Sequence, residues 1–173
     1  MYKIVLTGPE STGKTTLAQQ LADYYQTNWV EEYARTYIDG LNRAYEEADL
    51  LEMAKGQLQM EEKGLLTAQD FLFIDTDLIT FKIWAKYRYG RCDAWILEQI
   101  EERFYDLYIL CATDVLWEDD PQRENPDNRE ALFGLYVKEL ELYEKRFLVV
   151  KGGEKSRLAA VINHLNKHFM GTK

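Results

Sequence analysis

The segment Gly8-Pro9-Glu10-Ser11-Thr12-Gly13-Lys14-Thr15 matches the pattern GxxxxGK followed by Ser or Thr, between an apolar run and a stretch of helical periodicity. Its two glycines permit backbone angles and a close approach that a side chain forbids, so successive N–H groups can point into one concavity. Phosphate oxygens suit that concavity, with Lys14 placing a cation beside the β- and γ-phosphates and Thr15 offering a hydroxyl to Mg²⁺. The pattern therefore predicts a loop that binds the triphosphate of ATP, formed by Gly8, Glu10, Ser11, Thr12, Gly13, Lys14, Thr15 and Thr16.

A second candidate site lies at the end of the apolar run Phe71-Leu72-Phe73-Ile74-Asp75, which has the length of a buried strand. In P-loop proteins an aspartate at such a strand end holds Mg²⁺ directly or through water, so Asp75 is the expected metal partner of Thr15. Asp77 follows two residues later and could contact hydroxyls of a substrate, or could cap the next helix. The sequence leaves both interpretations of Asp77 open.

Two carboxylates and a guanidinium lie at the end of the predicted strand 29–31, in the run Glu31-Glu32-Tyr33-Ala34-Arg35. This is the edge at which open α/β sheets bind ligands. A hydroxyl acceptor needs a carboxylate to orient it and to take its proton, so Glu32 is the expected catalytic base, with Asp77 as its competitor. Tyr33 and Arg35 would then contact the acceptor, unless these residues are surface charges in which Arg35 pairs with a carboxylate.

Segment 114–130 interrupts the regular pattern, because Asp, Glu, Asn and Pro dominate it. Loops of this length inside compact domains are commonly lids, so we expect a lid here. Arg123 and Arg129 interrupt the acidic residues, and a closing loop would bring their charge to the nucleotide and to the transferred phosphoryl group. The alternative is that both arginines are solvated surface charges.

Other conspicuous residues are expected to be structural. His164 and His168 lie four residues apart, but no thiolate or carboxylate partner for a metal is evident nearby. The tyrosines and the tryptophans at 84, 95 and 117 are more typical of core or rim packing than of ligand stacking. Gly152-Gly153 could approach a nucleotide base or could simply turn the chain.

The elements that must position these residues alternate between strands and helices, as in a parallel sheet covered by helices on both faces. Five strands are predicted at 3–7, 29–31, 71–75, 107–112 and 147–150. Helical periodicity covers 17–25, 45–69, 79–89, 94–105, 132–143 and 158–169. With 173 residues and 46% hydrophobic content, the chain is expected to form one α/β domain over residues 1–173.

The net charge and the cysteine content restrict the kinds of molecule that the protein is expected to bind and the compartment in which it is expected to lie. A formal net charge of −9 leaves no excess of cations for nucleic acid or an anionic membrane, and no apolar run reaches the ~18 residues of a membrane span. Cys92 and Cys111 show no CxxC spacing, so we expect reduced thiols and a cytoplasmic location. A small molecule is the expected partner, and the sequence holds no signal for an oligomeric state.

Three further segments occur in a particular order: Glu32-Tyr33-Ala34-Arg35, Phe73-Ile74-Asp75-Thr76-Asp77 and Trp117-Glu118-Asp119-Asp120-Pro121-Gln122-Arg123. Together with the P-loop they make nearly the whole chain resemble the nicotinamide riboside kinase domain of the NadR family of P-loop kinases. Members often carry a tryptophan that stacks on nicotinamide directly before the Glu-Tyr pair. Glu31 has that place here, and Trp29 lies two residues earlier.

The resemblance implies ATP and Mg²⁺ as cofactors, and phosphorylation of the ribose 5'-hydroxyl of nicotinamide riboside to the mononucleotide. It also implies the sheet order 2-3-1-4-5, a lid that closes around Arg123, and Glu32, Arg35 and Asp77 on the acceptor side. Two other functions stay open on the sequence. One is a nucleotide-dependent switch or ATPase that binds a protein partner, and the other is a nucleoside monophosphate kinase.

Overall fold

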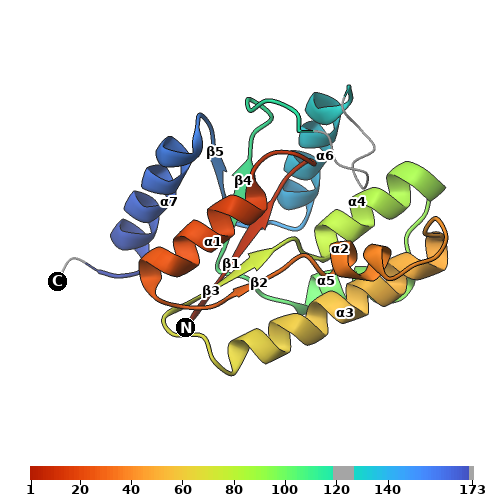
Figure 1. Cartoon of the computed structure of the whole chain (residues 1–173), viewed down its shortest axis with the longest axis horizontal. Coiled ribbons are helices and arrows are strands. Elements are labelled where there is room, and N and C mark those ends of the chain that lie inside the picture. The colour runs from red at the N-terminus through yellow and green to blue at the C-terminus, as the bar shows by residue number, and fades with distance from the viewer. Residues whose placement is uncertain (119–126, 172–173) are drawn as a thin grey trace.

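The computed structural model describes residues 1–118 and 127–171 and contains one parallel sheet (Figure 1). Its strand order is β2-β3-β1-β4-β5, which confirms the predicted α/β class and the order that the family resemblance implied. The strands are β1 (Tyr2–Thr7), β2 (Trp29–Val30), β3 (Phe71–Asp75), β4 (Leu107–Cys111) and β5 (Phe147–Val150).

Helices cover both faces of this sheet, as predicted (Figure 1). They are α1 (Lys14–Tyr25), α2 (Tyr33–Asp39), α3 (Glu47–Leu65), α4 (Leu78–Tyr89), α5 (Ala94–Glu102), α6 (Arg129–Leu142) and α7 (Glu154–His168). Alternate residues of a strand point to opposite faces, so each central strand contributes to two hydrophobic clusters. Ile4 and Leu6 pack with α1 and α7 on one face, while Val5 packs with α3, α4, α5 and α6 on the other.

Several element boundaries differ from those predicted. The second strand ends at Val30, so Glu31 lies outside it, and the fourth strand and the helices predicted at 45–69 and 94–105 are also shorter. The last two residues of the expected lid, Arg129 and Glu130, begin α6 instead. Helix α2 was not predicted, because only Ala34 is buried within its seven residues and no apolar period can appear. Residues 119–126 of the expected lid lie outside the described part of the chain.

Parallel pairing brings the carboxyl ends of β1 and β3 together. Leu6 lies opposite Asp75, and the Thr76 N–H donates to the Leu6 carbonyl at 3.0 Å. The loop after β1 therefore begins beside the carboxylate that ends β3. In open α/β sheets this edge, outside the carboxyl ends of the strands, is where ligands bind.

Two further observations bear on the expected environment of the protein. None of the helices in the described ranges 1–118 and 127–171 has both the length and the apolar character needed to cross a membrane. Cys92 and Cys111 are free thiols, the first partly buried and the second fully buried.

Candidate active site

The loop after β1 has the backbone conformation of an anion-binding concavity. Gly8, Ser11 and Gly13 have φ angles of 133°, 54° and 76°, in the region that favours glycine. A Cβ atom at Gly8 would lie 2.7 Å from the carbonyl oxygen of Cys111, so close packing also excludes a side chain there. Positive φ angles at these positions turn successive N–H groups toward one point, ahead of the first turn of α1. The predicted phosphate loop therefore has the shape that its chemistry requires.

Side chains of the loop itself hold this shape. The Thr12 hydroxyl, which is buried, donates to the carbonyl of Pro9 at 2.7 Å. The Lys14 ammonium donates to the carbonyls of Gly8 and Pro9 at 3.0 and 2.9 Å. Thr12 thus stabilises the conformation of the loop as well as lining the cavity. The two hydrogen bonds of Lys14 fix its ammonium group beside the same loop.

Arg157, at the start of α7, joins the P-loop to the segments that follow β4 and β5. Its guanidinium donates to the carbonyls of Thr12, Gly152 and Ala112 at 2.5, 2.7 and 3.0 Å. It also pairs with Asp114 at 2.5 Å, and the Asp114 carboxylate accepts from the Gly152 N–H at 2.6 Å. That backbone hydrogen bond, together with Arg157, holds the pKa of Asp114 below its usual value. Arg157 was not predicted as a site residue, because an arginine directly before a predicted helix carries no signal of such a role.

Asp75 and Thr15 lie together as predicted for a metal site. The Thr15 hydroxyl donates to Asp75 Oδ2 at 2.5 Å, and Asp75 is fully buried. Its Oδ1 atom has no hydrogen-bond partner among the described residues. Burial raises the pKa of Asp75, and the Lys14 ammonium and the Thr15 hydroxyl oppose that shift. A buried carboxylate oxygen without a partner, next to a hydroxyl, fits Mg²⁺, which prefers oxygen ligands.

In the described ranges, no group of three or more His, Cys, Asp or Glu side chains is placed to hold a metal ion. His164 and His168, whose rings lie 4.5 Å apart on α7, form no such group. Mg²⁺ commonly takes one or two protein ligands and fills its octahedron with water and phosphate oxygens. A site of only Thr15 and Asp75 is therefore sufficient for Mg²⁺ bound with a nucleotide.

Asp77 has a different environment from Asp75. Between them Thr76 adopts a φ of 73°, which ends the strand alternation and turns the chain into α4. Asp77 is 1% exposed, and its Oδ2 accepts a hydrogen bond from the Tyr108 hydroxyl at 2.9 Å. Burial raises its pKa to about 6. Asp77 is the N-cap residue of α4, although its side chain makes no capping hydrogen bond, and it does not line the cavity described next.

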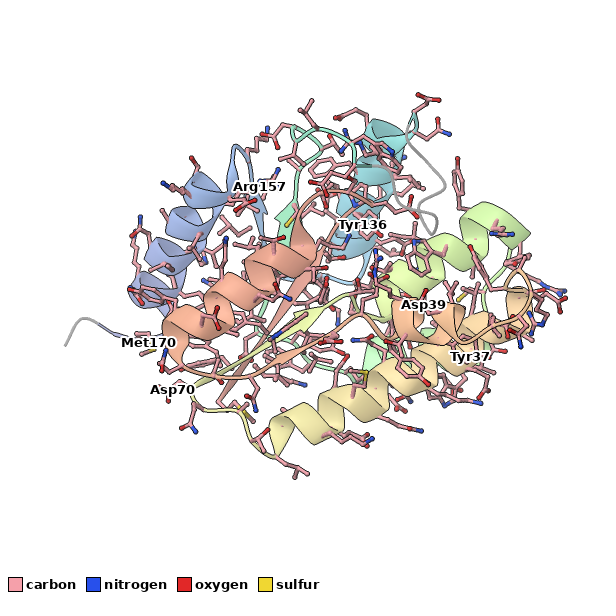
Figure 2. All side chains as sticks on the ribbon, in the orientation of Figure 1. Tyr37, Asp39, Asp70, Tyr136, Arg157 and Met170 are labelled. Carbon is pink, nitrogen blue, oxygen red and sulfur yellow. The ribbon has the colours of Figure 1, made fainter. Side chains whose placement is uncertain are left out.

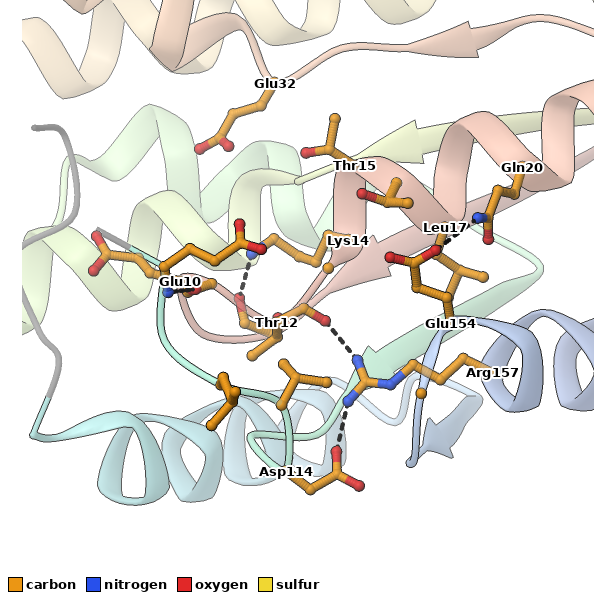
Figure 3. A pocket seen from close by; sticks show the side chains of 18 of the residues that line it. Glu10, Thr12, Lys14, Thr15, Leu17, Gln20, Glu32, Asp114, Glu154 and Arg157 are labelled. Atoms are coloured by element: carbon orange, nitrogen blue, oxygen red, sulfur yellow. Dashed lines mark hydrogen bonds and ion pairs between the residues drawn. The ribbon is translucent and has the colours of Figure 1, made fainter. Parts of the chain in front are cut away.

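A cavity of about 550 Å³ extends from the P-loop toward α2, α4 and α6. Figure 3 shows Glu32 reaching into it on one side of the P-loop, with Arg157 and Asp114 on the other. Its lining includes all the residues predicted to bind the triphosphate in segment 8–16, together with Glu32 and Arg35. The structure thus brings the predicted phosphate loop and two of the predicted acceptor residues into one space. Tyr33 does not line it.

Helix α3 holds the start of α2 in place. Gln57, which is fully buried, accepts from the Tyr33 N–H at 2.8 Å and donates to the Asp75 carbonyl at 3.4 Å. The Tyr33 ring lies over Gly56, where a Cβ atom would come within 1.9 Å of it. Tyr33 therefore packs under the acceptor end and does not face into it, and Gln57 and Gly56 place Glu32 beside the end of β3. Neither Gln57 nor Gly56 was predicted to have this role. The one signal in the sequence was Gly56 itself, a single glycine within a helical pattern.

The acceptor end of the cavity is lined by apolar and aromatic side chains: Ala34, Ile38, Trp84 and Tyr136. Trp84 and Tyr136 pack against the core, as expected of them, but they also face the cavity. Figure 2 shows Tyr136 near the middle of the molecule, and Arg157 apart from it near the start of α7. Trp29 packs against the cluster on the opposite face of the sheet, and Glu31 is exposed.

The base of the expected lid contacts the P-loop at Ser11. The Glu118 N–H donates to the Ser11 hydroxyl at 2.9 Å, and the Arg129 guanidinium donates to the carbonyls of Ser11 and Val115 at 3.2 and 2.9 Å. Arg129 also lies 5.7 Å from the centre of the Trp117 ring. Arg129 is therefore a partner of the P-loop backbone, whereas Arg123 lies outside the described residues.

Comparisons with known proteins extend this description. A family model described as AAA domain matches residues 3–157. The chain belongs to this family. This AAA-domain chain is 29% identical, over 174 residues, to the trifunctional NAD biosynthesis/regulator protein NadR of Salmonella typhimurium, with 97% of the chain and 42% of the relative covered. It is 26% identical over 157 residues to a cytidylate kinase of Staphylothermus marinus, with coverage of 88% and 79%.

The fold of this AAA-domain chain also matches solved structures. A crystal structure of NadR protein in complex with NR superposes with a TM-score of 0.82 at 23% identity, over 99% of this chain and 52% of that one. The chain thus spans about half or less of the length of the NadR proteins it matches. The resemblance to the NadR family is confirmed, and the shared fold is that of a P-loop kinase.

Proposed function

We propose that this protein is an ATP-dependent kinase that phosphorylates the ribose 5'-hydroxyl of nicotinamide riboside, or of a related nucleoside, to the mononucleotide. The observation that carries the proposal is the single cavity in which a phosphate loop, a carboxylate and an apolar end meet. The similarity to NadR over nearly the whole chain supports nicotinamide riboside as the acceptor. The cavity volume of about 550 Å³ is within the range typical of small-molecule binding sites.

In this proposal Glu32 orients the acceptor hydroxyl and takes its proton. The hydroxyl oxygen then attacks the γ-phosphorus of ATP, and the bond between that phosphorus and the bridging oxygen breaks to release ADP. Lys14 and the N–H groups of the P-loop hold the phosphate oxygens as their charge redistributes. Glu32 is the better candidate base, because it lines the cavity, whereas Asp77 is buried and bonded to Tyr108. Arg35, which also lines the cavity, would contact the acceptor.

Thr15 and Asp75 would hold Mg²⁺, which neutralises charge on the β- and γ-phosphates when bound. Arg129 would keep the P-loop and the base of the lid together through its bonds to Ser11 and Val115. Arg123 keeps its predicted role as the cation that the lid brings to the transferred phosphoryl group. A small-molecule partner and a cytoplasmic location complete the proposal, with free thiols at Cys92 and Cys111 as support for the location.

The decisive experiment supplies the purified protein with ATP, Mg²⁺ and a panel of ribosides, and follows ADP and phosphorylated product by chromatography. Nicotinamide riboside should give nicotinamide mononucleotide in a one-to-one ratio with ADP. Glu32→Gln should lower the rate about 10²-fold or more without weakening ATP binding. If no riboside raises ADP release above the rate without acceptor, the protein is not a riboside kinase.

A nucleoside monophosphate kinase is a second candidate, because the chain covers 79% of the cytidylate kinase it resembles. Such an acceptor brings two further negative charges, which need cations at the acceptor end. Among the described lining residues, Arg35 is the cation near that end, since Lys14 belongs to the P-loop and Arg157 is bound to Asp114. One cation against two further negative charges favours a sugar hydroxyl over a nucleotide phosphate as the acceptor. Faster turnover of CMP, AMP or dTMP than of any riboside would reverse the preference.

A further inference from the structure

The acceptor end of the cavity presents two aromatic side chains, Tyr136 on α6, which is 2% exposed, and Trp84 on α4, which is the more exposed of the two. Its indole is partly buried, and the ring of Phe81 packs edge-on against it at 5.6 Å, with an angle of 72° between the ring planes. Phe81 itself is fully buried in the core. One side of the indole is thus fixed by the core while Trp84 still lines the cavity, so it offers a rigid platform to a bound molecule.

None of the other tryptophans provides such a platform in the described cavity lining. Trp29 packs on the far face of the sheet with the residues around α1 and α7. Trp95 and Trp117 do not line the cavity. The residue directly before the Glu-Tyr pair is the exposed Glu31. A stacking contact to the acceptor is therefore expected from the partly exposed Trp84 on α4, since Tyr136 on α6 is 2% exposed.

Glu32 and Arg35 carry opposite charges and both line the cavity, so the preference for a positively charged ring comes from the indole itself. Glu32 lines the same end of the cavity, and its charge helps to raise the pKa of Tyr136, after the larger effect of burial. Burial raises the pKa of Asp75, and the Arg35 guanidinium is among the charges that oppose this shift. An indole face attracts cations more strongly than the other aromatic rings do.

We propose that Trp84 is a specificity-determining residue on which the base of the acceptor stacks, and that it selects a cationic pyridinium base over a neutral base of the same shape. The inference rests on the proposed riboside kinase function and identifies its base-binding residue. Ile38 and Ala34 would close the apolar side of this pocket, and Glu32 would add its negative charge. The ribose would then extend from the indole toward the P-loop.

The test compares two acceptors that share the ribose and the carboxamide. One is nicotinamide riboside, whose ring carries a positive charge, and the other is its 1,4-dihydro form, whose ring is neutral. In Trp84→Leu, kcat/KM for the charged riboside should fall about tenfold or more, while kcat/KM for the neutral form falls less than about threefold. Trp84→Phe keeps a ring with a weaker quadrupole, so its loss should lie between those of the parent and Trp84→Leu.

Trp95→Phe is the matched control, because Trp95 is a partly buried tryptophan of α5 that does not line the cavity. It should leave both kcat/KM values within twofold of the parent, and all variants should bind ATP like the parent. Equal losses with the two ribosides in Trp84→Leu would overturn selection by charge, and no loss with either would overturn the contact itself. A parent protein that phosphorylates neither riboside would instead refute the proposed function, before any variant is compared.

Discussion

The two ends of the cavity are built in different ways. The end expected to bind the nucleotide is formed mainly by segment 8–16, whose positive φ angles set the direction of its backbone N–H groups. The acceptor end combines side chains from three helices, with Glu32 at the start of α2, Trp84 on α4 and Tyr136 on α6. A site formed by backbone groups of one segment can be recognised from a contiguous sequence motif. A site formed by side chains from several helices cannot, because it depends on how those helices pack.

The same contrast appears within three residues at the end of β3. Asp75 faces the P-loop and bonds with Thr15, while Asp77 lies in the core against Tyr108. In a continuous strand residues two apart share a face, so both carboxylates would have met the ligand. The left-handed φ of Thr76 prevents this. One backbone angle therefore separates the carboxylate beside Thr15 from the carboxylate beside Tyr108.

The largest effect is expected at the nucleotide end. Lys14→Ala should lower kcat by roughly 10³-fold or more, because it removes the cation beside the transferred phosphate and leaves the backbone concavity in place. Steady-state kinetics with saturating ATP would measure this, with thermal unfolding to show that the fold is kept. The control is Lys155→Ala, an exposed lysine of α7 that does not line the cavity. A Lys14 variant as active as the parent would remove the ammonium group from the mechanism.

The next largest effect should distinguish the two aspartates after β3. Asp75→Asn should reduce activity about 10²-fold and raise the Mg²⁺ concentration needed for half-maximal rate, because a neutral amide holds the ion weakly. Asp77→Asn should stay within about threefold of the parent, because an amide oxygen can still accept from Tyr108. Magnesium titrations of initial rate compare the two variants directly. A larger loss in Asp77→Asn than in Asp75→Asn would reverse the assignment.

A smaller effect is expected from a pair of helix glycines that tests how the acceptor end is held. Gly56→Ala places a methyl group into the Tyr33 ring and should displace α2, so KM for the acceptor should rise about tenfold while KM for ATP changes little. At Gly134 on α6 a Cβ atom would have no neighbour within 4 Å. Gly134→Ala should therefore leave both KM values unchanged and stabilise the protein by about 0.5–1 kcal/mol.

The comparison of the two ends also shows which features could be predicted from the sequence. The α/β class and the P-loop conformation followed from local patterns, since apolar runs and glycines report directly on strands and φ angles. The meeting of Thr15 with Asp75 followed from the chemistry of P-loops, and the sheet order followed from the family resemblance alone. The roles of Gln57 and Arg157 could not be predicted, because each depends on contacts with residues remote in the sequence. Trp84 was predicted to pack against the core, and it does, but its place in the cavity lining could not be predicted for the same reason. An aromatic residue at helical spacing gives the same sequence pattern whether its ring packs against another helix or lines a cavity.

The smallest expected effect, on stability alone, lies outside both ends of the cavity. Glu61 on α3 is 2% exposed and accepts from the Tyr105 hydroxyl at 2.8 Å, and burial raises its pKa to about 7. The charge of Asp77 adds to this shift, while Arg103 and Lys3 oppose it. A raised pKa is often a sign of a catalytic group. Glu61 does not line the cavity, so here the shift reports burial and not catalysis.

The sign of the pH dependence follows from proton binding. Between the ordinary value of 4.5 and about 7, the folded protein holds a proton on Glu61 that the unfolded chain has lost. The free energy of unfolding must therefore fall as pH rises through this window, and Glu61→Gln should remove that part of the decline. Urea unfolding of parent and variant at pH 5 and pH 8 should show a difference that grows by roughly 1–3 kcal/mol in favour of the variant. Parallel pH profiles would mean that Glu61 is charged in the folded protein, and an altered kcat would place it in the reaction.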